Sequence, residues 1–194
     1  MGLIVKDTGD GDFELVPQGT HLAVCYMVAD LGLQESTWGI KHKVVLGFEI
    51  PSETVVIDGE HKPMIINNLY TASLNKKANL RQDLEGWRGR AFTDDELAGF
   101  DLKNVLGKSC MLTVVHETKG ERTWANITSI SALPKGVEAS EATRMLFYSE
   151  DEQDQFDDLP KWVQEKIRNQ VKQEESQDAV QDEPPPAFDD NIPF

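Results

Sequence analysis

Residues 39–50 alternate between two kinds of side chain, and this pattern constrains the fold more than any other feature of the chain. One set of alternating positions is apolar apart from a single histidine: Ile40, His42, Val44, Leu46, Phe48 and Ile50. The other set is mostly polar or small: Lys41, Lys43, Val45, Gly47 and Glu49. Because successive side chains of a β-strand point to opposite faces, the pattern predicts a strand with one face on a core. Gly47 in mid-strand predicts a bend or a bulge, a device that curls a sheet into a barrel.

Four further segments are predicted to be strands. The first of them is apolar on both faces, and the last two form a hairpin that turns at Lys119-Gly120. Their ranges are 20–31, 64–74, 109–117 and 122–133. Residues 51–63 contain Asp58-Gly59 and are predicted to form an exposed loop.

Helices are predicted at three places. Asn75 is expected to cap a helix whose apolar face is Ala78, Leu80, Leu84 and Trp87. Thr93 and Glu96 have the spacing of a capping box, which predicts a second, shorter helix. Residues 137–148 are expected to form an irregular or helical connector, and residues 159–172 a helix with a thin apolar stripe.

The predicted order is therefore three strands, a helix and two strands. This is the connectivity of an OB-fold, a five-stranded Greek-key barrel with a helix between strands three and four. A β-sandwich with a helical insertion is the alternative. We expect a mainly β protein with an OB-fold domain at 1–148, a connector and helix at 149–175, and a disordered acidic tail at 176–194.

The charge of the chain is unevenly placed. The net charge is -15, and residues 149–194, with 14 acidic and four basic side chains, account for -10 of it. Residues 1–148 are therefore only mildly acidic. This balance argues against indiscriminate nucleic-acid binding, so any phosphate-binding surface must be a local patch.

No pattern of catalytic or metal-ligating residues stands out. Cys25 and Cys110 lie in separate strand-like runs without metal-ligand spacing, so we expect buried thiols. The four histidines are scattered, and no phosphate-binding or dinucleotide-binding loop is present. We therefore expect no enzymatic activity, no cofactor and no metal. The sequence has no transmembrane-length apolar run and no signal peptide, so a cytoplasmic, membrane-free protein is predicted.

Residues 76–90 carry a local excess of positive charge beside aromatic rings. Single-stranded nucleic acid needs both, because cations contact phosphates and flat rings stack on unpaired bases. The candidate DNA-binding residues here are Lys76, Lys77, Arg81, Trp87, Arg88 and Arg90. The alternative is a solvated helix face with Trp87 in the core.

A second group of candidates belongs to the predicted second and third strands, where OB-folds usually bind their ligand. These candidates are Trp38, Lys41, Lys43, Lys62 and Tyr70. Paired lysines are also found on soluble edge strands that resist aggregation, which is the alternative for Lys41 and Lys43. Trp124, in the last strand, is a further candidate for base stacking or for the core.

Residues 184–194 combine acidic and apolar groups in a stretch that cannot build a core. Asp189, Asp190, Ile192, Pro193 and Phe194 are the candidate partner-binding residues. Phe194 would fill an apolar cup in a partner, with an arginine or lysine at the rim. Burying such a ring contributes about 1.5–3 kcal/mol, which suits a weak, exchangeable contact.

This segment resembles the C-terminal tip of bacterial single-stranded-DNA-binding proteins, with Asn191 where an aspartate is usual. The whole chain looks similar to phage-encoded single-stranded-DNA-binding proteins, which join one OB-fold to an acidic tail. In the body the likeness is diffuse and lies in residues 87–93 and 99–102. The resemblance implies that the protein protects single-stranded DNA in replication, recombination and repair, in a phage-infected cell's cytoplasm. It also implies that the tail recruits a helicase, polymerase, nuclease or recombinase.

Two questions stay open at this point. An adaptor that only competes for tail-reading pockets, without binding DNA, is the rival function. A single OB-fold has a short groove, which is consistent with homo-oligomers or cooperative assembly on DNA. The helix predicted at 159–172 is the candidate for that contact.

Overall fold

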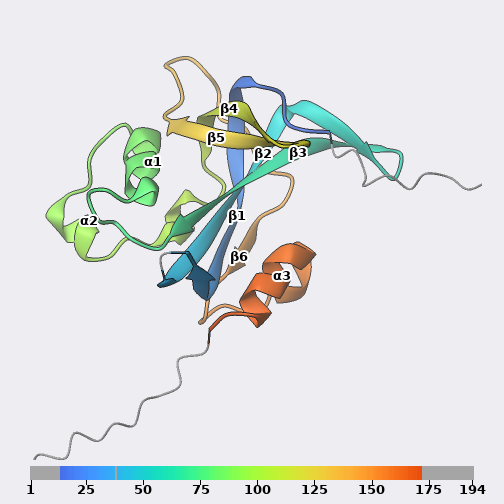
Figure 1. Cartoon of the computed structure of the whole chain (residues 1–194). Helices are drawn as coiled ribbons and strands as arrows, with labels where there is room; N and C mark the ends of the chain where they lie inside the picture. The colour runs from blue at the N-terminus through green and yellow to red at the C-terminus, as the bar shows by residue number, and fades with distance from the viewer. Residues whose placement is uncertain (1–13, 38, 172–194) are drawn as a thin grey trace, which may run out of the picture.

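The computed structural model describes residues 14–37 and 39–171 (Figure 1). Its strands are β1 (Gly19–Ser36), β2 (Gly39–Ile57), β3 (Glu60–Thr71), β4 (Ser109–Lys119), β5 (Arg122–Ser131) and β6 (Leu146–Tyr148). Its α-helices are α1 (Asn79–Arg88), α2 (Asp94–Ala98) and α3 (Lys161–Arg168), and two 3-10 turns, η1 (Leu102–Val105) and η2 (Phe156–Asp158), complete the elements. The prediction of a mainly β protein is confirmed.

The strands form one mostly antiparallel sheet in the order β3-β2-β1-β4-β5. The long strand β1 belongs to two ladders, since its first part pairs with β4 and its remainder with β2. The edge strands β3 and β5 contact each other, but no ladder joins them in the described part of the chain. The sheet therefore curls on itself and stays open along one seam.

Strand β6 adds a short parallel pairing to β1 at residues 27–29. The expectation of an irregular or helical connector over residues 137–148 is wrong at its end, because Leu146–Tyr148 is a strand. Leu146 and Tyr148 are buried while Phe147 between them is only half-buried. Three residues are too few for alternation to reveal a strand from sequence.

Gly47 sits opposite a bulge that lies in the neighbouring strand. The β1–β2 register skips Tyr26, which places Tyr26 and Met27 in the same cluster of buried residues. A Cβ atom at Gly47 would lie 2.8 Å from the Tyr26 ring, so glycine makes the room that the bulge needs. At this bulge two consecutive residues of β1 share one face, so its side chains do not alternate strictly.

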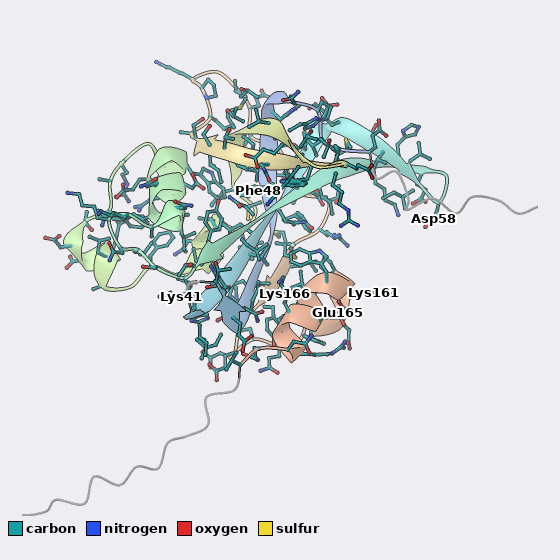
Figure 2. All side chains as sticks on the ribbon, viewed as in Figure 1. Lys41, Phe48, Asp58, Lys161, Glu165 and Lys166 are labelled. Carbon is teal, nitrogen blue, oxygen red and sulfur yellow. The ribbon has the colours of Figure 1, made fainter. Side chains whose placement is uncertain are left out.

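Strands β2 and β3 form one long hairpin, so the predicted exposed loop at 51–63 is wrong. The ladder continues to the pair Ile57 and Glu60, leaving Asp58-Gly59 as a two-residue turn. Both turn residues have positive φ, 54° and 81°, as a type I′ turn requires. Figure 2 shows Asp58 at the far tip of this hairpin, with Phe48 nearer the centre of the molecule.

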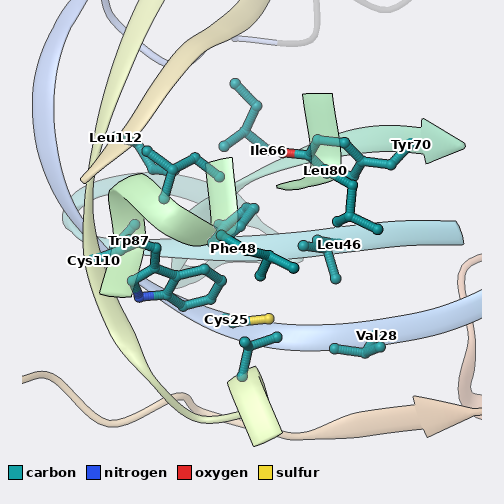
Figure 3. Packing of buried hydrophobic residues seen from close by; sticks show 14 of the residues in the cluster. Cys25, Val28, Leu46, Phe48, Ile66, Tyr70, Leu80, Trp87, Cys110 and Leu112 are labelled. Carbon is teal, nitrogen blue, oxygen red and sulfur yellow. The ribbon is translucent and has the colours of Figure 1, made fainter. Parts of the chain in front are cut away.

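The main core lies between the inner face of the curled sheet and α1. Phe48 of β2 and Trp87 of α1 meet there with ring centroids 5.6 Å apart (Figure 3). The thiols of Cys25 and Cys110 are buried and unbonded to each other, as predicted. Burial raises the pKa of Cys25 to about 12, so this thiol stays protonated and unreactive.

A second core lies on the outer face of β1 and β2. Val163 and Ile167 of α3 are buried there, together with Leu31 and Val45 from the strands. Strands β1 and β2 are thus covered on both faces over part of their length. Helix α3 is shorter than the predicted 159–172, because Pro160 precedes its first residue and Asn169 follows its last.

The helices between β3 and β4 differ from prediction in one detail. Helix α1 follows Ala78, which makes no side-chain cap, so Asn75 is not its cap. The capping box of α2 is present, with the Thr93 hydroxyl accepting from the Glu96 backbone and the Glu96 carboxylate accepting from Thr93. Across the described ranges, no helix has the length and apolar character needed to cross a bilayer.

Candidate nucleic-acid interface

Lys41 and Lys43 lie on the outer face of the sheet at the start of β2. By strand alternation they share a face with Val45, whose side chain belongs to the outer core, while their neighbours Ile40 and His42 are themselves exposed. Lys43 is opposite Thr71 of β3, and its ammonium group donates to the Thr71 hydroxyl at 2.9 Å. Leu69 of β3 is opposite Val45 and is 44% exposed. We call the outer side of β2 and β3 around Lys41, Lys43 and Leu69 the lysine strip.

The segment after β3 carries two more lysines. The Ala72 backbone donates to the His42 carbonyl, so the chain leaves β3 beside the start of β2. Lys76 and Lys77 follow within one turn and are exposed. Among residues 14–37 and 39–171, neither these two lysines nor Lys41 has a carboxylate within salt-bridge distance.

Two of the acidic groups near the lysine strip, Asp30 and Asp83, are held by other partners, whereas Glu35 beside Gln34 of β1 is exposed. The Asp30 carboxylate is 2.6 Å from His42 Nε2 and also accepts from the Gly32 backbone at 2.8 Å. Asp83 accepts from the Tyr70 hydroxyl at 2.7 Å. Burial raises the pKa of Asp83, and the hydrogen bond from Tyr70 opposes that effect. The lysines therefore keep a locally positive surface on an acidic chain.

The three arginines of residues 81–90 are not free cations. Arg81 donates to Glu85 at 2.9 Å, and Arg88 and Arg90 both donate to Glu96. Hydrogen bonds from Arg90, and next from the Thr93 backbone, lower the pKa of Glu96 to about 2. A carboxylate that is ionised at neutral pH cancels much of the arginine charge. The arginines of the predicted basic helix face are therefore mostly engaged in salt bridges within the protein.

Arg88 and Arg90 also line a cavity of about 400 Å³ beside α2, η1 and the start of β4. The Arg88 guanidinium lies over the rings of Phe92 and Phe100, at 4.4 and 5.2 Å from their centroids. Only 15% of the Arg88 side chain is exposed. This burial favours a role in packing against Phe92 and Phe100 over contact with a phosphate.

Two of the predicted DNA-contacting rings are in the core. Trp87 is 7% exposed, and its indole donates to the Ser109 carbonyl at 2.8 Å. Tyr70 is 2% exposed and bonds Asn68 as well as Asp83. Burial raises the pKa of Tyr70, so its hydroxyl remains a donor. The prediction that these rings stack on bases is corrected, because neither presents a face to solvent.

The remaining candidates are dispersed. Lys62 falls on the Met64 face of β3, opposite the lysine strip, and lies 3.6 Å from Glu60. Trp124 is 37% exposed on β5, opposite Glu117, far along the sheet from β2. Trp38 lies outside the described residues, as do the five tail residues 189, 190, 192, 193 and 194.

Sequence reasoning missed the acidic partners of the arginines, although their signals were present. Arg81 and Glu85 are four residues apart on one helix, the spacing at which opposite charges meet. Glu96 was recognised as half of a capping box, but its second role, bridging two arginines, depends on the packing of α2 against α1. Leu69 and Thr71 were assigned to a strand without being recognised as part of a surface.

The described residues contain no cluster of three or more histidine, cysteine, aspartate or glutamate side chains that could hold a metal ion. The lysine strip combines cations, an exposed aliphatic side chain and a hydroxyl group. Neither a scan against protein-family models nor a search of curated proteins returned a match for this chain.

Proposed function

We propose that this chain is a single-stranded-DNA-binding protein built on an OB-fold. DNA would cross the lysine strip, with Lys41, Lys43, Lys76 and Lys77 contacting phosphates. The exposed aliphatic surface around Leu69 would lie under sugars and bases. The strand would be held without cofactor or catalysis.

The support for an OB-fold is the strand order. An OB-fold is a partly open five-stranded barrel that binds its ligands on the face of strands two and three. Here the order β3-β2-β1-β4-β5, the contact between β3 and β5, and α1 between β3 and β4 agree with that architecture. The seam between β3 and β5 corresponds to the open part of such a barrel.

One observation carries the proposed function: the lysine strip is positive on a protein whose net charge is -15. Acidic side chains outnumber basic ones almost two to one, with 34 against 19. In such a chain, Lys41 and Lys43 on one face of β2 and Lys76 and Lys77 in the segment after β3 gather four positive charges with no acidic residue of the sequence between 61 and 82. Phosphate groups are the complementary ligand.

The test is binding of fluorescently labelled oligo-dT and of a duplex of equal length to the full chain at several salt concentrations. We expect tighter binding of oligo-dT, with a slope of about 0.7 per phosphate contact on a log–log plot. The double variant Lys41→Ala/Lys43→Ala is expected to bind more weakly and to lower the slope by about 1.4.

The matched control is Lys135→Ala/Lys161→Ala, which removes the same charge from exposed positions away from the lysine strip. Equal behaviour of the two double variants would place the DNA on another surface. If the unaltered chain fails to bind oligo-dT at low salt, single-strand binding is refuted and the adaptor function is favoured.

We further propose that residues 189–194 recruit replication or recombination enzymes. The support is sequence alone, the pairing of Asp189 and Asp190 with Ile192 and Phe194. Phe194→Ala removes the ring and leaves every charge in place. It is expected to abolish binding of a helicase or nuclease that reads such tails, while oligo-dT affinity stays unchanged. Pull-down and anisotropy on the same preparations measure the two effects, and retained partner binding would refute this role of the ring.

A further inference from the structure

Helix α3 covers β1 on the same outer face as the lysine strip. Val163 and Ile167 are four residues apart and form the buried stripe of the helix. With 3.6 residues per turn, the positions on either side of this stripe form two flanks. Gln164 and Arg168 lie on one flank, and Trp162 and Lys166 lie on the other.

The flank with Gln164 and Arg168 faces β6. Gln164 donates to the Leu159 carbonyl at 2.9 Å. The Arg168 guanidinium lies 5.0 Å from the centroid of the Phe156 ring, which in turn packs against Tyr148 of β6 at 5.6 Å. Strand β6 pairs with the edge of β1 that β2 does not occupy. This flank therefore points away from β2.

The opposite flank, with Trp162 and Lys166, is therefore on the β2 side of the helix. A direct contact agrees: the Gln34 side chain donates to the Lys166 carbonyl at 2.8 Å. Gln34 is the ladder partner of Lys41, so both side chains leave the same face of the sheet. Figure 2 shows Lys166 on the side of α3 nearer the strands and Lys161 on the side away from them.

The lysine strip lacks one component that single-strand binding requires. Its exposed apolar side chains are aliphatic, Leu69 and Ile65 at 44% and 43% exposure, and the described part of β2 and β3 presents no phenylalanine, tyrosine or tryptophan ring on this face, where the exposed His61 lies toward the hairpin tip. Aromatic rings are the usual platforms for unpaired bases. Trp162 is half-buried at the border of the strip, and no carboxylate within the described ranges pairs with Lys166.

We propose that α3 is one wall of the single-stranded-DNA groove, with Trp162 stacking on a base and Lys166 contacting a phosphate. This inference rests on the proposed function and adds a second element to the DNA site. Helix α3 carries three basic residues and one acidic residue, Glu165, which lies on the side opposite the buried stripe. A strand of DNA would run between this wall and the lysines of β2.

The first test compares two lysines of the same helix in the full chain. Lys166→Gln is expected to weaken oligo-dT binding and to lower the salt slope by about 0.7, the value of one phosphate contact. Lys161→Gln removes the same charge from the flank away from β2 and is expected to bind like the parent. Equal effects of the two variants would overturn the inference.

The second test concerns the ring. Trp162→Leu keeps apolar volume against the outer core but removes the stacking surface, so oligo-dT binding is expected to be about 5- to 150-fold weaker. Trp162→Phe keeps a smaller ring and is expected to restore part of the affinity. Parent-like affinity of Trp162→Leu would overturn the role of the ring.

A readout on the unaltered chain removes any dependence on variant stability. The indole N–H resonance of Trp162, assigned by its loss in Trp162→Phe, is expected to shift on titration with oligo-dT. An unmoved resonance in a chain that binds oligo-dT would overturn the inference and leave the lysine strip intact. A chain that binds no oligo-dT would instead refute the proposed function itself.

Discussion

The sequence leaves two roles open for Trp87, stacking on DNA bases or packing in the core. The structure places this side chain in the core. Trp87→Phe removes the indole N–H that donates to the Ser109 carbonyl at 2.8 Å and shrinks a ring packed 5.6 Å from Phe48. Losing the donor for this part-buried carbonyl costs about 0.5–1.5 kcal/mol. The unfilled volume adds to this, so we expect about 2–4 kcal/mol of destabilisation.

Urea unfolding followed by circular dichroism measures the effect. With an m-value of about 2 kcal/mol/M, the midpoint is expected to fall by about 1–2 M. Trp124→Phe is the matched control, since its ring is 37% exposed, and we expect a loss below about 1 kcal/mol. Affinity of folded Trp87→Phe for oligo-dT is expected to equal the parent's. A nearly unchanged midpoint together with weaker oligo-dT binding would refute the core assignment.

Two further perturbations test the packing around the site. Gly47→Ala places a Cβ 2.8 Å from the Tyr26 ring and is expected to cost about 1–3 kcal/mol in urea unfolding, whereas Gly99→Ala, with open space around it, is expected to be nearly neutral. Equal stability of the two variants would contradict the tight approach. Glu96→Gln is expected to lower the free energy of unfolding at pH 7, because the folded pKa of about 2 lies below the ordinary 4.5. This stabilisation is fully present above pH 4.5 and is lost as the pH falls toward 2, so a parent-to-variant difference that is independent of pH would contradict the ion pairs.

The sequence alone determined the elements whose signals are local. Alternation over 39–50 predicted β2 because a half-buried strand repeats every two residues. Thr93 and Glu96 predicted the start of α2, since both capping hydrogen bonds are made within four residues. The Lys119-Gly120 turn predicted the β4–β5 hairpin for the same reason. Lys41 and Lys43 followed from that alternation and lie together on one face of β2.

The tertiary structure decided which of the charged and aromatic residues are available to a ligand. The sequence predicts a basic patch at Arg88 and Arg90, but α2 packs so that Glu96 forms ion pairs with both arginines. Tyr70 and Trp87 read as stacking rings, yet the curl of the sheet and α1 bury them. Trp162 is only half-buried against the outer core, which the apolar stripe of its helix does not reveal. Periodicity and capping depend only on residues that are neighbours in the sequence, so they can be predicted from the sequence alone. Burial and charge pairing depend on residues that are distant in the sequence, so only the tertiary structure decides them.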